Sequence, residues 1–576
     1  MRIVRAAGML LAIAAAAACG TGSAAPAAPA APAPATTTTT AKHTTTALTT
    51  THTTTKRTAT AAPTTTPATT TRPPFTMADT WHAITTAIYD LGSAPLVGVA
   101  GSPSTRWWGV VSAPSDGPGP YPVAIVLHGA HAYCSVTGNE RAWPCPPGNE
   151  VPNHEGLAYL TDALATRGFV AIAPGINDEF AISNDNGTRA FGAVAAAEVD
   201  RDLKAMAAGS GSLGVRASEV DLTHIVMVGH SRGAALAAVL GRPTGNPKVS
   251  RVVSGLVLLA PSADSVDPTL LADVPAAVVI GTCDGDTGVD GGRFVSPSLD
   301  VKRRNKPVAL IMIDRATHNA TNDRLSPEAV PPGRPACAAT DRLDPVVQRR
   351  TLAALVPELA RATLGAAATG DGAQAFNRLR ADDQVQPGTR IVHIDPTALR
   401  TSLLPKLGLP VPTAGFTPQW CPGGRYAPYR APGTEPCHRL ELEDLAGWPS
   451  GLELTWNNPG AALTVPVPAS LIGSGSELVL RVLVDPADTR VGVGPVVLLL
   501  TARNGSTTSW TKDVSLVVTP VGTVDTGAYI ARRGALLWSE RRTPFEQAAT
   551  SLTISATSPN AGSLLLVSLE VVSAPR

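Results

Sequence analysis

The pattern of apolar and polar positions differs between the middle and the last third of the chain. From about residue 77 to 365, short and nearly continuous apolar runs alternate with Ala-rich stretches of helix formers. Such an alternation predicts βαβ units around a mostly parallel, buried sheet. We therefore expect an α/β domain over residues 77–365. Its predicted strands span 123–127, 170–173, 225–228, 256–259, 276–280 and 308–313, and its predicted helices span 157–167, 192–207, 232–240 and 345–364.

The pattern changes beyond about residue 370, where helical periodicity largely disappears. Short apolar runs separated by Gly, Pro, Asn and Asp predict strands joined by turns. We expect an all-β sandwich, jelly-roll-like, over residues 386–576, after a linker at 366–385. The clearest predicted strands span 452–456, 478–484, 496–501, 515–518 and 564–572.

The first residues have the pattern of an export signal. Arg2 and Arg5 precede a short apolar run that ends in small residues before Cys19, which predicts a signal peptide over residues 1–18. Residues 16–19 resemble the lipobox of bacterial lipoproteins, in which the cysteine is lipidated, while cleavage of a plain signal peptide nearby is the alternative. We expect an exported protein of the cell envelope or the extracellular space, which contacts a membrane only through a lipid anchor on Cys19.

A segment rich in Ala, Pro and Thr follows, over residues 19–76. It has almost no large apolar side chain, so it cannot bury enough surface to offset the entropy lost on ordering. We expect a disordered tether between the anchor and the folded domains.

Length and charge narrow the class of protein. The chain has 576 residues, and because hydrophobic cores usually divide beyond roughly 250 to 300 residues, two folded domains are expected. The net charge is only +1, so there is no basic surplus to neutralise a phosphate backbone. The low net charge therefore argues against nucleic-acid binding. We also expect the protein to be a monomer.

One short motif carries the candidate chemistry. Residues 229–233 read Gly-His-Ser-Arg-Gly, a G-x-S-x-G sequence that follows one predicted strand and precedes one predicted helix. Strand, sharp turn and helix are the context that a nucleophile elbow requires, because the glycines let the backbone turn tightly and expose the serine hydroxyl. Ser231 is therefore the candidate nucleophile.

A serine hydroxyl needs a base and an orienting acid, and both follow later in the chain. His318 comes after the predicted strand 308–313, and Asp284 and Asp286 come after the predicted strand 276–280. Sequence does not separate the two aspartates, although the distance of Asp284 from the strand end favours it. The alternative, in which both belong to an acidic turn or bind a cation incidentally, stays open.

The loop after the predicted strand 123–127 is expected to complete the site. It reads His128-Gly129-Ala130-His131 and occupies the position from which one oxyanion donor usually comes. We expect the backbone amides of Ala130 and Arg232 to bind the developing oxyanion.

These residues resemble those of the α/β-hydrolases over about residues 119–365, and more loosely those of exported bacterial hydrolases in the dienelactone-hydrolase, chlorophyllase and cutinase-like polyester-hydrolase group. The resemblance implies Ser231 as nucleophile, His318 as base, Asp284 or Asp286 as acid, and the amides of Ala130 and Arg232 as oxyanion hole. The closer likeness rests on the motifs Leu127-His128-Gly129, Trp143-Pro144-Cys145, Gly156 to Leu160, Gly175-Ile176-Asn177, Cys283 to Asp286 and Thr317-His318-Asn319.

Six cysteines besides Cys19 are expected to form disulfides in an exported protein. By proximity and motif context the pairs are Cys134 with Cys145, Cys283 with Cys337, and Cys421 with Cys437, one of 15 connectivities. Zinc is disfavoured because no pair has C-x-x-C spacing, and neither a metal nor an organic cofactor is expected.

The sequence thus predicts a serine hydrolase of carboxylic esters, of carboxylesterase, lipase or polyesterase type, that forms an acyl-enzyme. Its partner would be a small-molecule or polymeric ester, and the β-sandwich is a candidate site for carbohydrate or polymer. The alternatives are an envelope glycan- or polymer-binding protein with an inactive hydrolase scaffold, and an amide or thioester hydrolase.

Overall fold

A computed structural model describes the part of the chain discussed below. The described residues are 80–96, 99, 101, 103–138, 140–182, 191–209, 211–242, 253–263, 266, 271–288, 291–295, 298, 304–326, 337, 339–369, 389–394, 399–406, 408–421, 450–484, 496–516, 537–558 and 561–573. The predicted signal peptide, Cys19 and the tether lie outside these ranges. So does most of the predicted linker 366–385, whose first residues form the end of helix α6.

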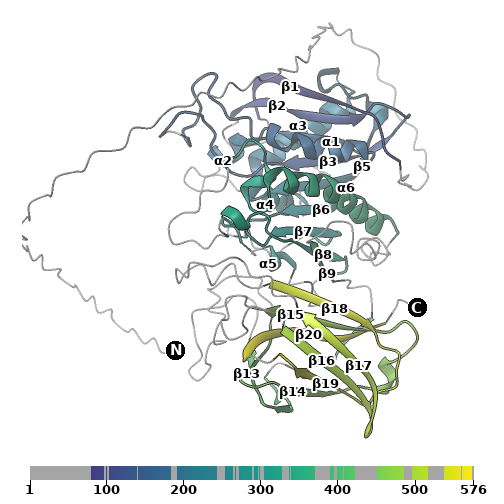
Figure 1. Cartoon of the computed structure of the whole chain (residues 1–576). Helices are drawn as coiled ribbons and strands as arrows, with labels where there is room; N and C mark the ends of the chain where they lie inside the picture. The colour runs from purple at the N-terminus through teal and green to yellow at the C-terminus, as the bar shows by residue number, and fades with distance from the viewer. Residues whose placement is uncertain are drawn as a thin grey trace, which may run out of the picture. The chain divides into compact units, whose positions relative to one another are not determined.

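The first sheet is mixed and has nine strands within the described ranges, in the order β1-β2-β4-β3-β5-β6-β7-β8-β9 (Figure 1). The six strands from β4 to β8 in this order run parallel, while β1, β2 and β9 pair antiparallel at the two edges. The strands are β1 Ile84–Pro95, β2 Ser104–Pro114, β3 Tyr121–Leu127, β4 Val170–Pro174, β5 Val220–His230, β6 Val253–Leu259, β7 Ala276–Gly281, β8 Val308–Ile313 and β9 Thr389–Ile394.

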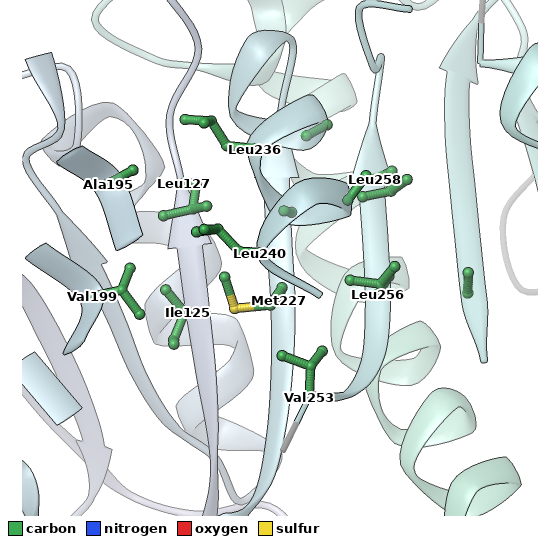
Figure 2. Packing of buried hydrophobic residues seen from close by; sticks show 14 of the residues in the cluster. Ile125, Leu127, Ala195, Val199, Met227, Leu236, Leu240, Val253, Leu256 and Leu258 are labelled. Carbon is green, nitrogen blue, oxygen red and sulfur yellow. The ribbon is translucent and has the colours of Figure 1, made fainter. Parts of the chain in front are cut away.

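Helices pack on both faces of this sheet because its central strands are apolar on both sides. On one face, Ile125 and Met227 pack with Val199 of α3 and Leu236 of α4 (Figure 2). On the other face, Val126 and its neighbours pack with α1 and α6. The helices are α1 Ala158–Thr166, α2 Asn177–Ile182, α3 Ala193–Ala207, α4 Arg232–Leu240, α5 Gly292–Val295 and α6 Pro345–Thr369.

The three antiparallel strands of the first sheet, β1, β2 and β9, have no counterpart among the strands predicted from sequence. Most residues of β1 are exposed, so the strand has no continuous apolar run to indicate it. Strand β9 lies in the range 386–576, which sequence assigns to the second domain, yet it pairs with β8 of the first sheet. Each of the six predicted strands, in contrast, coincides with part of β3 to β8.

The last part of the chain forms two further antiparallel sheets, which share one hydrophobic core. One has the order β12-β13-β20-β15-β18 with β10 paired to β20, and the other has the order β11-β14-β19-β16-β17. This arrangement is compatible with the predicted all-β domain. The strands are β10 Leu399–Ser402, β11 Thr413–Ala414, β12 Phe416–Cys421, β13 Gly451–Trp456, β14 Ala462–Pro466, β15 Glu477–Val484, β16 Val496–Asn504, β17 Thr507–Leu516, β18 Leu537–Pro544, β19 Ser551–Ala556 and β20 Gly562–Ser573.

Candidate active site

Ser231 lies at a sharp, strained turn between β5 and α4. Its φ is 58° and its ψ is −127°, a conformation that a residue with a side chain rarely adopts. Among the described residues, the non-glycine residues with positive φ are Ser231, Ala260 and Arg315, which follow the ends of β5, β6 and β8. Backbone strain is therefore concentrated at the carboxyl edge of the parallel strands, where functional sites tend to store it.

The two glycines that flank the serine motif are required by close backbone contacts. A methyl group at Gly229 would lie 2.3 Å from the carbonyl oxygen of Gly233. One at Gly233 would lie 2.3 Å from the carbonyl oxygen of His128, so the first turn of α4 packs directly on the loop after β3. The sequence Gly-x-Ser-x-Gly thus folds as the tight strand-to-helix turn predicted from its context.

His318 and Asp284 form a buried pair. Nδ1 of His318 lies 2.9 Å from Oδ2 of Asp284, and both side chains are almost fully buried. The other carboxylate oxygen of Asp284 accepts hydrogen bonds from the backbone amides of Asp286, Thr287 and Gly288. Burial alone would raise the pKa of Asp284, but His318 and these amides outweigh it and lower the pKa. Asp284 is therefore held as a carboxylate against the imidazole.

Close packing holds the loops of the acid and the base together. A methyl group at Gly281 would lie 2.3 Å from the carbonyl oxygen of Ala316, and the amide of Cys283 donates to the same oxygen at 2.9 Å. Gln348 of α6 fixes the residue before the histidine, because its side chain bonds both the amide and the carbonyl of Thr317, at 2.8 and 2.7 Å. Sequence reasoning missed Gln348, since nothing in the local pattern links α6 to this loop.

Asp286 lies on the opposite side of the imidazole. Its Oδ2 is 3.5 Å from Nε2 of His318, and 57% of its side-chain surface is exposed. The structure thus separates the two acids that the sequence left open: Asp284 contacts Nδ1 from the interior, and Asp286 contacts Nε2 from the surface.

Ring and backbone contacts bring the serine turn next to the histidine loop. The ring centroids of His230 and His318 are 4.7 Å apart, and those of His131 and His230 are 5.6 Å apart. A methyl group at Gly129 would touch both His131 Nε2, at 2.7 Å, and Ser231 Cβ, at 2.8 Å. The loop after β3, the turn at Ser231 and the loop of His318 therefore meet at one place.

The proposed oxyanion loop is held by His128, a residue whose role the sequence did not indicate. Its Nδ1 donates to the carbonyl of Gly129 at 2.8 Å, and its Nε2 accepts from the amide of Ile176 at 3.0 Å. Burial lowers the pKa of His128 to about 4, so the ring is neutral at pH 7. Because C=O and N–H point in opposite directions in a trans peptide, the bond to Gly129 directs the amide of Ala130 away from His128.

Arg232 is the first residue of α4, and its amide is one of the first amides of the helix, which have no acceptor within the helix. The helix begins directly after Ser231, so its amino end lies at the serine turn. Such amides and the helix dipole favour a developing negative charge. This is the arrangement that an oxyanion site needs.

Two of the three predicted disulfides lie between described residues. Cys134 is bonded to Cys145, and Cys283 to Cys337. Cys421 is disulfide-bonded as well, while its predicted partner, Cys437, lies outside the described residues.

No group of three or more His, Cys, Asp or Glu residues in the described ranges could hold a metal ion. No described helix is both long and apolar enough to cross a membrane. No protein-family model matches the chain, and no match was found among curated proteins.

Proposed function

We propose that the chain is a serine hydrolase of carboxylic esters with an α/β-hydrolase fold. The observation that carries this proposal is the buried contact of 2.9 Å between His318 and Asp284, next to a strained serine turn at the carboxyl edge of a parallel sheet. The strand order and the chain order Ser, Asp, His support it, because an elbow after a central strand and an acid and base on later loops are typical of this fold.

In the proposed mechanism, Ser231 attacks the ester carbonyl while Nε2 of His318 takes its proton. Asp284 holds the ring through Nδ1 and stabilises the imidazolium that forms. The amides of Ala130 and Arg232 bind the tetrahedral oxyanion. The imidazolium then returns the proton to the leaving alcohol, and water repeats both steps on the acyl-enzyme. These steps use residues of the chain alone.

Hydrolysis of a soluble p-nitrophenyl ester tests this proposal. Replacing Ser231 with Ala should lower turnover by a factor on the order of 10⁶, as loss of the nucleophile does in comparable triads. Ser115→Ala, at an exposed serine after β2, is the matched control and should retain full activity. Equal turnover in wild type and Ser231→Ala, with both folded by circular dichroism, would contradict the assignment.

We also propose that the protein is exported and anchored through lipid on Cys19. The support is the order of charge, apolar run and small residues before that cysteine. Labelled palmitate should be incorporated into the wild-type chain and not into Cys19→Ser. Equal incorporation in the two chains would contradict anchoring at this residue.

A further inference from the structure

His318 lies between two carboxylates that differ in their burial and in the ring nitrogen that they contact. Asp284 is buried and contacts Nδ1 at 2.9 Å, whereas Asp286 is 57% exposed and lies 3.5 Å from Nε2. One turn holds both, because the amide of Asp286 donates to Asp284 at 2.9 Å. Orientation of the ring requires one carboxylate, and Asp284 provides it. The position of Asp286 therefore needs a separate explanation.

Nε2 is the nitrogen that exchanges a proton with the reacting groups. In the proposed mechanism it receives the proton of Ser231 and then gives it to the oxygen of the leaving alcohol. That oxygen must come within hydrogen-bond reach of Nε2, at roughly 2.6 to 3.2 Å. A carboxylate 3.5 Å from the same nitrogen consequently lies close to the leaving oxygen when that oxygen takes its proton.

Positive charge lies on the side of the proposed oxyanion loop. Arg232 is half-buried at the start of α4, and Arg141 is exposed in the segment after that loop. Burial is the main cause of the lowered pKa of His131, His318 and His128 come next, and both arginines lower it further, which places their charges near this ring. The candidate site therefore has a negative group at Nε2 of His318 and positive groups near His131.

We propose that Asp286 is a specificity-determining residue that selects esters whose alcohol portion carries a positive charge. This inference rests on the proposed ester hydrolase function. A cation on the alcohol would be attracted by the Asp286 carboxylate as the leaving oxygen approaches Nε2, and an anionic alcohol would be repelled. Because Asp286 is largely solvated, the expected preference is modest, about two- to fivefold, and it should weaken with added salt.

The test compares two esters of the same acid and nearly the same shape, acetylcholine and 3,3-dimethylbutyl acetate, which differ in the charge on the alcohol. Wild type should show a kcat/KM about two- to fivefold higher for the cationic ester. Relative to wild type, the ratio should fall about two- to fivefold in Asp286→Asn and further in Asp286→Lys. In wild type, 0.5 M salt should reduce it. Asp513→Asn, at an exposed aspartate of β17, is the control and should keep the wild-type ratio.

The outcomes separate this inference from the proposal on which it rests. If wild type hydrolyses the neutral ester and the ratio is the same in wild type, Asp286→Asn and Asp286→Lys, the role of Asp286 is overturned and ester hydrolysis stands. A wild-type preference for the neutral ester would overturn it as well. If folded wild type hydrolyses neither ester and is not labelled by a fluorophosphonate, both proposals fail together.

Discussion

At the scale of single residues, the neutral state of His128 decides how the loop after β3 is held. Its Nε2 accepts a hydrogen bond from Ile176, and a proton on that nitrogen would abolish the acceptor. The pKa of His128 is lowered by burial from 6.5 to about 4 in the folded protein. The neutral ring therefore stabilises the fold fully above about pH 6.5, and this contribution is lost as the pH falls towards 4.

The lowered pKa of His128 predicts how the free energy of unfolding depends on pH. A shift of this size corresponds to up to about 3.5 kcal/mol, at about 1.4 kcal/mol per pKa unit. His128→Asn should be less stable than wild type at pH 7, and the difference should shrink towards pH 4.5, because only wild type loses this contribution. Urea unfolding at both pH values measures it. A difference that stays constant or grows at low pH would show that His128 does not titrate in this way.

Asp202 of α3 should have the opposite dependence on pH. It is buried, accepts hydrogen bonds from Trp107 at 2.6 Å and Tyr89 at 3.2 Å, and has a pKa that burial raises to about 7. Because the folded protein keeps a proton that the unfolded chain releases near pH 4, this group destabilises the fold increasingly as the pH rises from about 4 to 7.

Asp202→Asn removes this ionisation while keeping an oxygen that can accept from Trp107. We expect the variant to be more stable than wild type at pH 8 by about 2 kcal/mol, allowing for a weaker hydrogen bond to the indole. Near pH 4 the gain should vanish, since wild type is then already protonated. Thermal melts at the two pH values check this, and a gain at pH 4 as large as at pH 8 would refute the mechanism.

At the scale of elements, the site depends on α4 packing against the loop after β3. A methyl group at Gly233 meets backbone oxygens of His128 and Leu127 at 2.3 and 2.5 Å, so helix and loop must separate to admit it. Gly233→Ala should destabilise the protein by about 1 to 3 kcal/mol, as overpacking does, and should lower esterase turnover by shifting the oxyanion loop.

The control for this prediction is Gly211→Ala. A methyl group at Gly211 meets no atom within 4 Å, so this variant should match wild type in both stability and turnover. Melting temperature and ester hydrolysis should be measured on the same preparations. If Gly233→Ala were as stable and as active as Gly211→Ala, the close approach of α4 to the loop would be incorrect.

The strands of the structure differ in how clearly the sequence indicates them. Strands β3 to β8 were predictable because burial on both faces requires continuous apolar runs. An edge strand such as β1 is largely exposed and needs no continuous apolar run. Its formation depends on hydrogen bonds to the neighbouring strand, which its own sequence does not indicate. Strand β17 begins at Thr507, earlier than the predicted strand 515–518, because its first residues are largely exposed and polar.

Part of the candidate site was also predictable from the sequence. Ser231 and His318 follow buried strands, so their place at the sheet edge follows from the pattern. Asp284 and Asp286 stand two residues apart in one turn, and only the folded turn shows which of them faces Nδ1. His128 and Gln348 act through bonds to distant backbone groups, which no local motif indicates.

At the scale of the whole molecule, the proposed chemistry belongs to the first sheet alone. Its serine, acid and base follow β5, β7 and β8, and β9 extends this sheet beyond the range predicted for the domain. Most buried apolar residues of the two later sheets form a second hydrophobic core, and these sheets contribute no residue to the proposed triad. The β-sandwich predicted there stays a candidate site for carbohydrate or polymer.

The most direct test of the central claim is labelling of the intact protein with a fluorophosphonate, followed by mass spectrometry to locate the label. This reagent reacts with a serine that a neighbouring base activates. We expect one label per chain, on Ser231, lost in His318→Ala and retained in Ser115→Ala. Folded wild-type protein that stays unlabelled, or that carries its label on another serine, would contradict it.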